Sequence, residues 1–127
     1  MKNRTAVTAL PTSEDMNLLI VDAIQDIKGK NIVKLDLTSL EEAPARYFII
    51  CEGESSTQVK AISENIGKKL KDKMGVSPNH IEGMEGSRWI LVDYFDTVVH
   101  VFYPETRAFY DIEELWGDAN VTQFENI

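Results

Sequence analysis

The sequence predicts a single α/β domain in which one mixed β-sheet is flanked by helices. The chain has 127 residues, of which 43% are hydrophobic and 27% are charged, as is typical of a globular domain with one core. Segments with helical spacing of apolar residues alternate along the chain with short apolar or alternating runs. Helices packed against one sheet are the simplest arrangement of such an order.

The first helix is expected to begin at Thr12 or Ser13, either of which can cap a helix. Acidic residues follow in its first turn, where they complement the helix dipole. Apolar residues then recur at helical spacing as far as Gly29, which ends the helix. Residues 1–12 show no periodicity and are expected to form a flexible arm.

Two strands and a second helix follow the first helix. Residues 32–37 alternate between apolar and polar side chains, which predicts a half-buried strand. Residues 46–52 are apolar through their middle, which is typical of a central strand covered on both faces. The next helix is capped by Ser55 or Ser56 and ends at Gly75. It could connect two parallel strands by a right-handed crossover.

The second half of the chain predicts a short strand at 80–82 and a hairpin of strands at 88–94 and 97–103. Pro104 suits the first turn of a terminal helix, which is expected to run from residue 105 to residue 116. We therefore divide the chain into an arm at 1–12, one domain at 13–118 and a C-terminal tail at 119–127.

Charge limits the classes of partner. The chain has 13 Lys and Arg against 21 Asp and Glu, a formal net charge of -8. This balance argues against nonspecific binding to nucleic acid or to an anionic membrane, and it favours basic partners. No apolar run is long enough to span a bilayer, and no signal peptide is evident, so we expect a cytoplasmic protein. A single cysteine, Cys51, excludes an internal disulfide and a Cys-based zinc cluster.

Motifs for catalysis are weak in this sequence, and we expect no metal and no cofactor. Residues 53–56 could cradle a phosphate at a helix N-terminus, but a capped helix start is the favoured interpretation. Asp93 and Asp96 lack the alternate spacing that would point two carboxylates to one side of a strand. His80 and His100 form no known metal-binding motif, and a packed or partner-contacting histidine is favoured.

Aromatic residues are concentrated between residues 89 and 116. Alternation places Trp89 and Asp93 on one side of their strand and Tyr94 on the other. Both sides are apolar, so either helices cover both faces or one face binds a protein. Phe95 is unsuited to the positive φ of the favoured two-residue turns, which leaves the type of this hairpin turn open. The lysine-rich face of residues 60–73 is interpreted as a solvated helix face, with local contact to RNA as the alternative.

An ordered series of motifs extends over about residues 14–118. It includes Arg46-Tyr47-Phe48-Ile49-Ile50, Ile81-Glu82-Gly83, Trp89-Ile90-Leu91-Val92-Asp93-Tyr94, Asp96-Thr97-Val98-Val99-His100-Val101-Phe102, Phe109-Tyr110-Asp111 and Leu115-Trp116-Gly117-Asp118. This series resembles the ribosomal silencing factor family, also called the Iojap or RsfS family. Phe95 stands where family members commonly have glycine. Ala45-Arg46 stand where a small acidic residue is common.

The resemblance implies a nucleotidyltransferase-like fold without catalytic function. It also implies binding to the large ribosomal subunit through ribosomal protein fourteen, at the face where the small subunit docks. The bound factor would block subunit joining and so repress translation when nutrients are scarce. The family further implies a possible homodimer and no extensive contact with nucleic acid. Two alternatives stay open: a nucleotidyltransferase-like nucleotide-binding domain or enzyme, and a dimerisation module of unknown partner.

The resemblance also assigns a partner-binding surface. Within it we expect Trp89 and Tyr94 to be apolar anchors. Arg107 either joins that surface or bridges the terminal helix to a carboxylate. Because acidic residues predominate from residue 105 onwards, we expect this acidic end to lie beside the partner. The assigned residues are Trp89, Asp93, Tyr94, Asp96, His100, Arg107, Tyr110 and Trp116, of which Asp93 and Asp96 are expected to face Lys or Arg of the partner.

Overall fold

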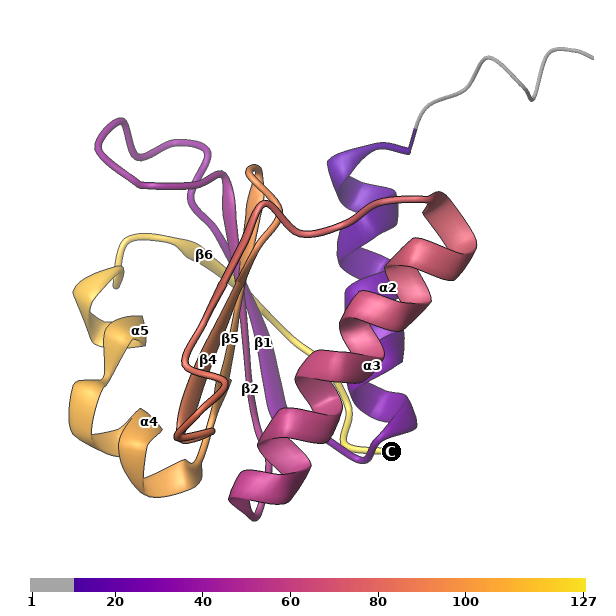
Figure 1. Ribbon diagram of the computed structural model, residues 1–127. Coiled ribbons are helices and arrows are strands. Elements are labelled where there is room, and N and C mark those ends of the chain that lie inside the picture. Colours follow the sequence, from indigo (N-terminus) through magenta and orange to yellow (C-terminus); the bar gives the residue numbers. More distant parts are fainter. Residues whose placement is uncertain (1–10) are drawn as a thin grey trace, which may run out of the picture.

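A computed structural model describes residues 11–127 of the chain (Figure 1). Almost all of the predicted arm at 1–12 lies outside these residues. The helices are α2 (Ser13–Asp26), α3 (Ser56–Met74), α4 (Pro104–Tyr110) and α5 (Ile112–Leu115). The strands are β1 (Lys30–Asp36), β2 (Tyr47–Glu52), β3 (His80–Glu82), β4 (Trp89–Asp93), β5 (Thr97–Phe102) and β6 (Asn120–Gln123).

The strands form one sheet in the order β3-β4-β5-β2-β1-β6. Strands β2 and β5 pair in parallel, and every other neighbouring pair is antiparallel. The predicted α/β class with one mixed sheet is therefore confirmed. The hairpin is confirmed as well, because β4 pairs with β5 in a regular register from Trp89↔Phe102 to Asp93↔Val98.

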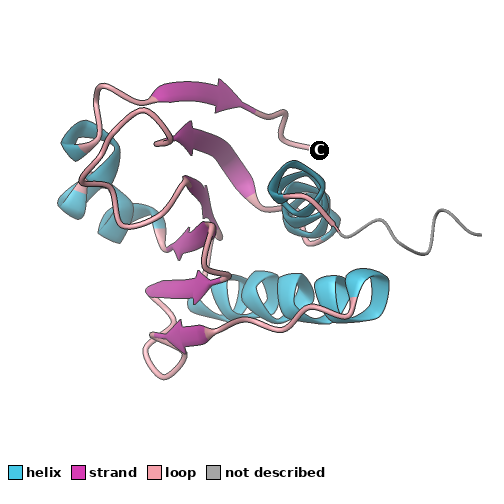
Figure 2. Ribbon diagram, turned by 90° about the horizontal axis from the view of Figure 1, so that it is seen from above, coloured by secondary structure: helices cyan, strands magenta, loops and turns pink. Residues whose placement is uncertain are grey.

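Helices cover both faces of the sheet (Figures 1 and 2). Helices α2 and α3 pack on one face and form a first core with it. Ile24, Ile62 and Ile66 of this core have no solvent-exposed surface. Helices α4 and α5 lie on the opposite face, over a second core that includes Phe48 and Phe102. The central strands are buried on both sides, which explains why their sequences are apolar without interruption.

The helix starts follow the predicted capping. Thr12 caps α2, and its hydroxyl accepts the backbone N–H of Asp15 at 3.0 Å. Ser55 caps α3 by accepting the backbone N–H of Gln58 at 3.1 Å. Gly75 ends α3 in a left-handed conformation with φ of 68°, which glycine adopts without steric cost.

The structure corrects the predicted terminal helix at 105–116. That segment contains two short helices, because Asp111 takes a left-handed conformation with φ of 44° and interrupts the helix. The backbone N–H of Asp111 still donates to the carbonyl of Arg107 at 2.8 Å and so completes the last turn of α4. The break reorients α5, which allows Ile112 and Trp116 to pack against the second core.

The predicted tail at 119–127 is also corrected, since part of it forms the edge strand β6. This strand pairs antiparallel with β1, from Val33↔Gln123 to Asp36↔Asn120. All four residues of β6 are exposed, so the segment has no alternating pattern by which it could be recognised. Pairing with β1 satisfies backbone groups that would otherwise be free at the edge of the sheet.

The turn of the β4–β5 hairpin is resolved by the structure. Phe95 has φ of 71°, the region that a bulky residue adopts rarely. The backbone N–H of Asp96 donates to the carbonyl of Tyr94 at 3.0 Å, and a carboxylate oxygen of Asp93 accepts the N–H of Phe95 at 2.7 Å. The turn therefore holds Phe95 in a strained conformation with 71% of its surface exposed.

Candidate functional site

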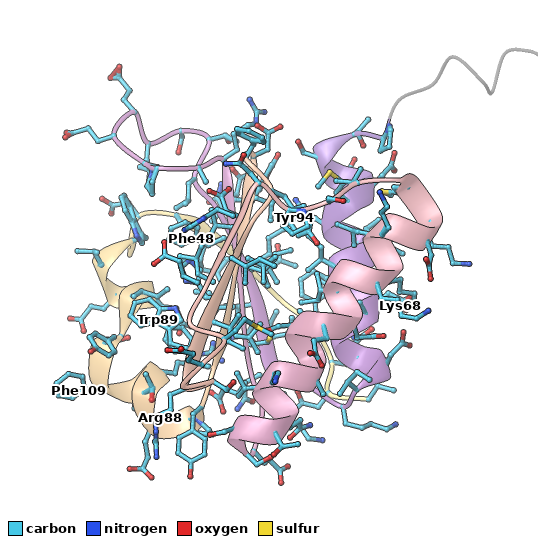
Figure 3. The ribbon with its side chains drawn as sticks, viewed as in Figure 1. Phe48, Lys68, Arg88, Trp89, Tyr94 and Phe109 are labelled. Carbon is cyan, nitrogen blue, oxygen red and sulfur yellow. The ribbon has the colours of Figure 1, made fainter. Side chains whose placement is uncertain are left out.

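Strand β4 presents its side chains alternately to the two faces of the sheet, as its sequence predicts. Trp89 points toward α4 and α5, whereas Tyr94, just beyond the strand, points toward α2 (Figure 3). Tyr94 is only 5% exposed and belongs to the first core. Burial raises the pKa of its hydroxyl to about 12. The expected pair of anchors is therefore separated by the sheet, and Trp89 alone lies on the side of α4 and α5.

An aromatic cluster fills the space between β4, β5 and α4. The indole N–H of Trp89 donates to Nδ1 of His100 at 3.1 Å. The Trp89 ring stacks on Phe102 with centroids 4.8 Å apart and contacts Tyr110 at 4.9 Å. Trp89 thus packs between the sheet and α4. Its ring is only partly buried, so it both supports the fold and contributes to the surface.

His100 is a core residue of this cluster. It is 4% exposed and packs edge-on against Phe48 with ring centroids 4.5 Å apart. Burial lowers the pKa of His100 to about 4, because charging the ring would require desolvation of an imidazolium. Its Nδ1 accepts a hydrogen bond from Trp89, so the proton of the neutral ring is on Nε2. The predicted contact between His100 and a partner does not fit this buried position.

Arg107 connects α4 to the rest of the fold. Its guanidinium forms a two-pronged pair with Glu113 at 2.9 and 3.0 Å and also bonds Glu52 at 3.1 Å. A further bond reaches the backbone carbonyl of Asn31 at 2.7 Å. Burial opposes the charge of Arg107, but its carboxylate partners outweigh burial and raise the guanidinium pKa. Of the two predicted roles of Arg107, the bridge to a carboxylate is the one that the structure confirms.

The two aspartates of the hairpin lie at the far end of β4 from Trp89. Asp93 is half-buried and caps the turn through its bond to Phe95. Asp96 is exposed, and its carboxylate accepts the hydroxyl of Ser13 at 2.7 Å. This bond ties the turn to the start of α2. Both carboxylates have local structural partners, and among residues 11–127 no three His, Cys, Asp or Glu side chains gather as metal ligands.

An exposed apolar surface lies on the two short helices. Phe109 is 80% exposed, Leu115 is 74% exposed and Tyr110 is 55% exposed, while the ring of Trp116 is half-buried. Phe109 projects away from the sheet at the outer side of α4 (Figure 3). We call these four residues the α4–α5 surface. Exposed apolar groups on two successive helices are characteristic of a binding surface.

Acidic residues adjoin the α5 part of the α4–α5 surface. A cavity of about 390 Å³ adjoins Leu115 and Trp116 and is shared with Leu40 of the loop before β2. Its rim also holds acidic residues, whose negative charge suits a partner with lysine or arginine around an apolar group. These rim residues are Glu41, Glu42 and Asp118.

The structure divides the predicted surface into two groups. Tyr94, His100 and Arg107 are buried and serve the fold, so their assignment to a contact surface is corrected. The others reach solvent at least in part, namely Trp89, Asp93, Asp96, Tyr110 and Trp116. Phe109 and Leu115 are exposed although they are not among the predicted surface residues, because apolar residues at helical spacing ordinarily form a buried face.

Other candidate chemistry takes structural roles. In the turn at 53–56, the N–H of Glu54 already donates to the side-chain oxygen of Gln58 at 2.7 Å, and Ser55 caps α3. The favoured interpretation as a capped helix start is confirmed. Cys51 is fully buried, and burial raises the pKa of its thiol to about 12. None of the helices in residues 11–127 has the length and apolar character to cross a membrane.

The fold and its exposed surface together define an α/β domain with a candidate protein-binding face. A sequence model of the family described as "Ribosomal silencing factor during starvation" matches residues 10–127. The chain belongs to this ribosomal silencing factor family.

Relatives and solved structures agree with this membership. The chain is 37% identical to "Ribosomal silencing factor RsfS" of Halalkalibacterium halodurans, over 91% of this chain and 97% of the relative. It is 43% identical to the protein of the same name from Chromobacterium violaceum, over 82% and 84% of the two chains. A crystal structure of a Chromobacterium violaceum protein, 42% identical, superposes with a TM-score of 0.79 over 84% of this chain and 87% of that chain.

Proposed function

We propose that this protein binds the large ribosomal subunit through ribosomal protein fourteen and sterically blocks joining of the small subunit. Membership of the ribosomal silencing factor family supports a ribosome-associated silencing role. The observation that carries the proposal is the α4–α5 surface, where Phe109 and Leu115 are both largely exposed and Leu115 lies beside acidic residues.

The charge of the chain favours a basic ribosomal protein as the partner of this surface. The whole chain has a net charge of -8, so the phosphates of ribosomal RNA repel it. A basic protein exposed on the subunit would attract the acidic rim and bury the apolar side chains, which are the usual source of affinity. Tyr110 and Trp116 belong to the residue types that dominate such contacts, and Trp89 supports Tyr110 from beneath.

The proposed role requires no catalysis. Relatives are named as silencing factors, which favours a binding protein over an enzyme. The nucleotidyltransferase-like fold, the homodimer and the cytoplasmic location stay predictions of the family resemblance. Blocking by bulk requires only that the bound domain occupies the face where the small subunit docks.

Sedimentation of ribosomal subunits tests this function. The full chain, added in saturating amounts to purified large and small subunits, is expected to co-sediment with the large subunit and to reduce the peak of joined ribosomes. Leu115→Asp should weaken co-sedimentation about tenfold by placing a charge in the apolar contact. Leu18→Asp is the matched control, since Leu18 is 59% exposed on α2, across the sheet from α4 and α5.

Three outcomes would contradict the proposal. Subunit joining could be unchanged at saturating protein, which would exclude the blocking mechanism. The folded protein could fail to co-sediment with the large subunit, which would exclude the binding. Equal binding by the Leu115→Asp and Leu18→Asp variants would show that the α4–α5 surface is not the contact.

A further inference from the structure

A second apolar groove lies on the other side of the sheet, between α3 and the segment that leads through β3. Its cavity of about 480 Å³ is lined by Gly67 of α3 and by Pro78, Ile81 and Met84 of the facing segment. Ile81 is 45% exposed although it is a large apolar residue. We call this cavity the α3–β3 groove. It shares no lining residue with the α4–α5 surface.

Gly67 keeps the floor of this groove open. It lies in the middle of a 19-residue helix, where glycine costs about 1 kcal/mol relative to alanine. A Cβ atom placed at this position would meet no atom of residues 11–127 within 4 Å, so packing against these residues does not require glycine here. The absent side chain instead allows another molecule to approach the helix backbone.

Within residues 11–127, strand β3 supplies a free sheet edge beside the groove. It is the outermost strand on its side of the sheet, and its three residues are all exposed. Ile81 pairs with Val92, so its side chain points to the face that α3 covers. An extended segment added along β3 would therefore place the residue opposite Ile81 into the groove over Gly67.

The charge of α3 indicates the kind of segment that fits. Lys68 and Lys71 line the groove, and Glu64 is the single acidic residue among its lining. The ion pair of Lys68 with Asp72 is solvent-exposed and therefore weak. In an acidic chain this helix carries Lys60, Lys68, Lys69, Lys71 and Lys73 against Glu64 and Asp72, and of these lysines Lys69 pairs with Asp22 and Asp26 of α2.

RNA fits the groove less well than an acidic polypeptide. The groove lining contains no aromatic residue on which a base could stack. Its apolar floor favours aliphatic side chains instead. We propose that the α3–β3 groove is a docking site for an extended, acidic segment of a partner protein, with one apolar residue in the groove and an acidic residue two positions away. This site is independent of the proposed ribosome contact, and both could be occupied together.

Selection of peptides on the folded full chain tests the proposal. The probe is a phage library of random peptides of about ten residues, the length of an added strand and its flanks. The peptides that are retained by the wild type and lost on Gly67→Leu are expected to pair a central aliphatic residue with Asp or Glu. Leucine is a good helix former and meets open space at this position, so the variant should remain folded.

Affinity measurements on the selected peptides then separate shape from charge. By fluorescence anisotropy, Gly67→Leu and Lys71→Glu should each raise the Kd about tenfold or more. Lys73→Glu is the matched control, because Lys73 carries the same charge on the same helix but does not line the groove. It should change the Kd less than about threefold.

Several results would overturn the proposal. Selected peptides could bind Gly67→Leu as well as the wild type, or the selection could yield no retained peptide. The retained peptides could also be basic. Binding of labelled oligouridine that Lys71→Glu abolishes, with no peptide binding, would assign the groove to RNA instead. Circular dichroism of each variant confirms that it is folded.

Discussion

The indole N–H of Trp89 donates a hydrogen bond to Nδ1 of His100, across the β4–β5 pair and beneath α4. Both residues come from the segment with the highest density of aromatic residues, and both were expected on a binding surface. The bond instead gives them a shared structural role. Trp89 keeps a partly exposed ring that supports Tyr110, whereas His100 is buried.

Replacing Trp89 by phenylalanine should separate these roles. Trp89→Phe keeps a ring over Phe102 but removes the donor to His100, which leaves a buried acceptor without a partner. We expect the free energy of unfolding to fall by about 1–2 kcal/mol, measured by urea denaturation. Trp89→Ala should cost more, because it also removes a large ring from the second core. A loss of similar size in both variants would show that the hydrogen bond, and not the ring, determines the contribution of Trp89.

The buried His100 should make stability depend on pH. Its pKa is lowered to about 4, whereas the ordinary value is 6.5. Below pH 6.5 the unfolded chain therefore binds a proton that the folded chain excludes, and stability falls as the pH falls toward 4. Between pH 7 and pH 5 this one group should lower the free energy of unfolding by about 2 kcal/mol.

Denaturation of His100→Gln at the two pH values checks this expectation, because the variant lacks the titrating ring. The difference between wild type and variant should shrink from pH 7 to pH 5. His80→Gln is the control, since it removes a histidine whose side chain is 54% exposed. An identical pH dependence in His100→Gln and wild type would contradict the buried neutral ring.

Arg107 should be essential for the position of α4. Arg107→Met leaves Glu52 and Glu113 without their cation, and we expect a loss of about 3 kcal/mol in the free energy of unfolding. The stability of Arg107→Lys should lie between those of the wild type and Arg107→Met, because lysine keeps the charge but not the two-pronged geometry. The control is Arg88→Met, since Arg88 is exposed and lies over the ring of Tyr103. Equal stability of Arg107→Met and Arg88→Met would refute this role.

The strained turn offers a stabilising substitution. Phe95 has φ of 71°, so Phe95→Gly should raise the free energy of unfolding by about 1 kcal/mol through relief of the backbone strain. Phe95→Ala is the control, because it removes the aromatic ring but keeps a Cβ atom in the same conformation. Thermal denaturation of the two variants distinguishes strain from ring contacts. A glycine variant no more stable than the alanine variant would show that the turn stores no strain.

Local signals in the sequence predicted most of the fold. Thr12 and Ser55 start their helices because the capping hydrogen bond involves residues only three positions apart. The uninterrupted apolar run of β2 predicted that other elements cover both faces of the sheet at this strand. Strand β6 could not be predicted from its own residue pattern. It is a strand because it pairs with β1, which lies far away in the chain.

The fold class, the helix starts, the hairpin and the two-sided apolar character of β4 all follow from local patterns in the sequence. Contacts between distant segments instead set which residues of the acidic, aromatic end meet solvent. The break at Asp111 and the anchor at Arg107 orient α5, so Leu115 is exposed while Trp116 is half-buried. The physical reason is that periodicity reports which residues share a face, whereas exposure depends on whether a distant segment covers that face.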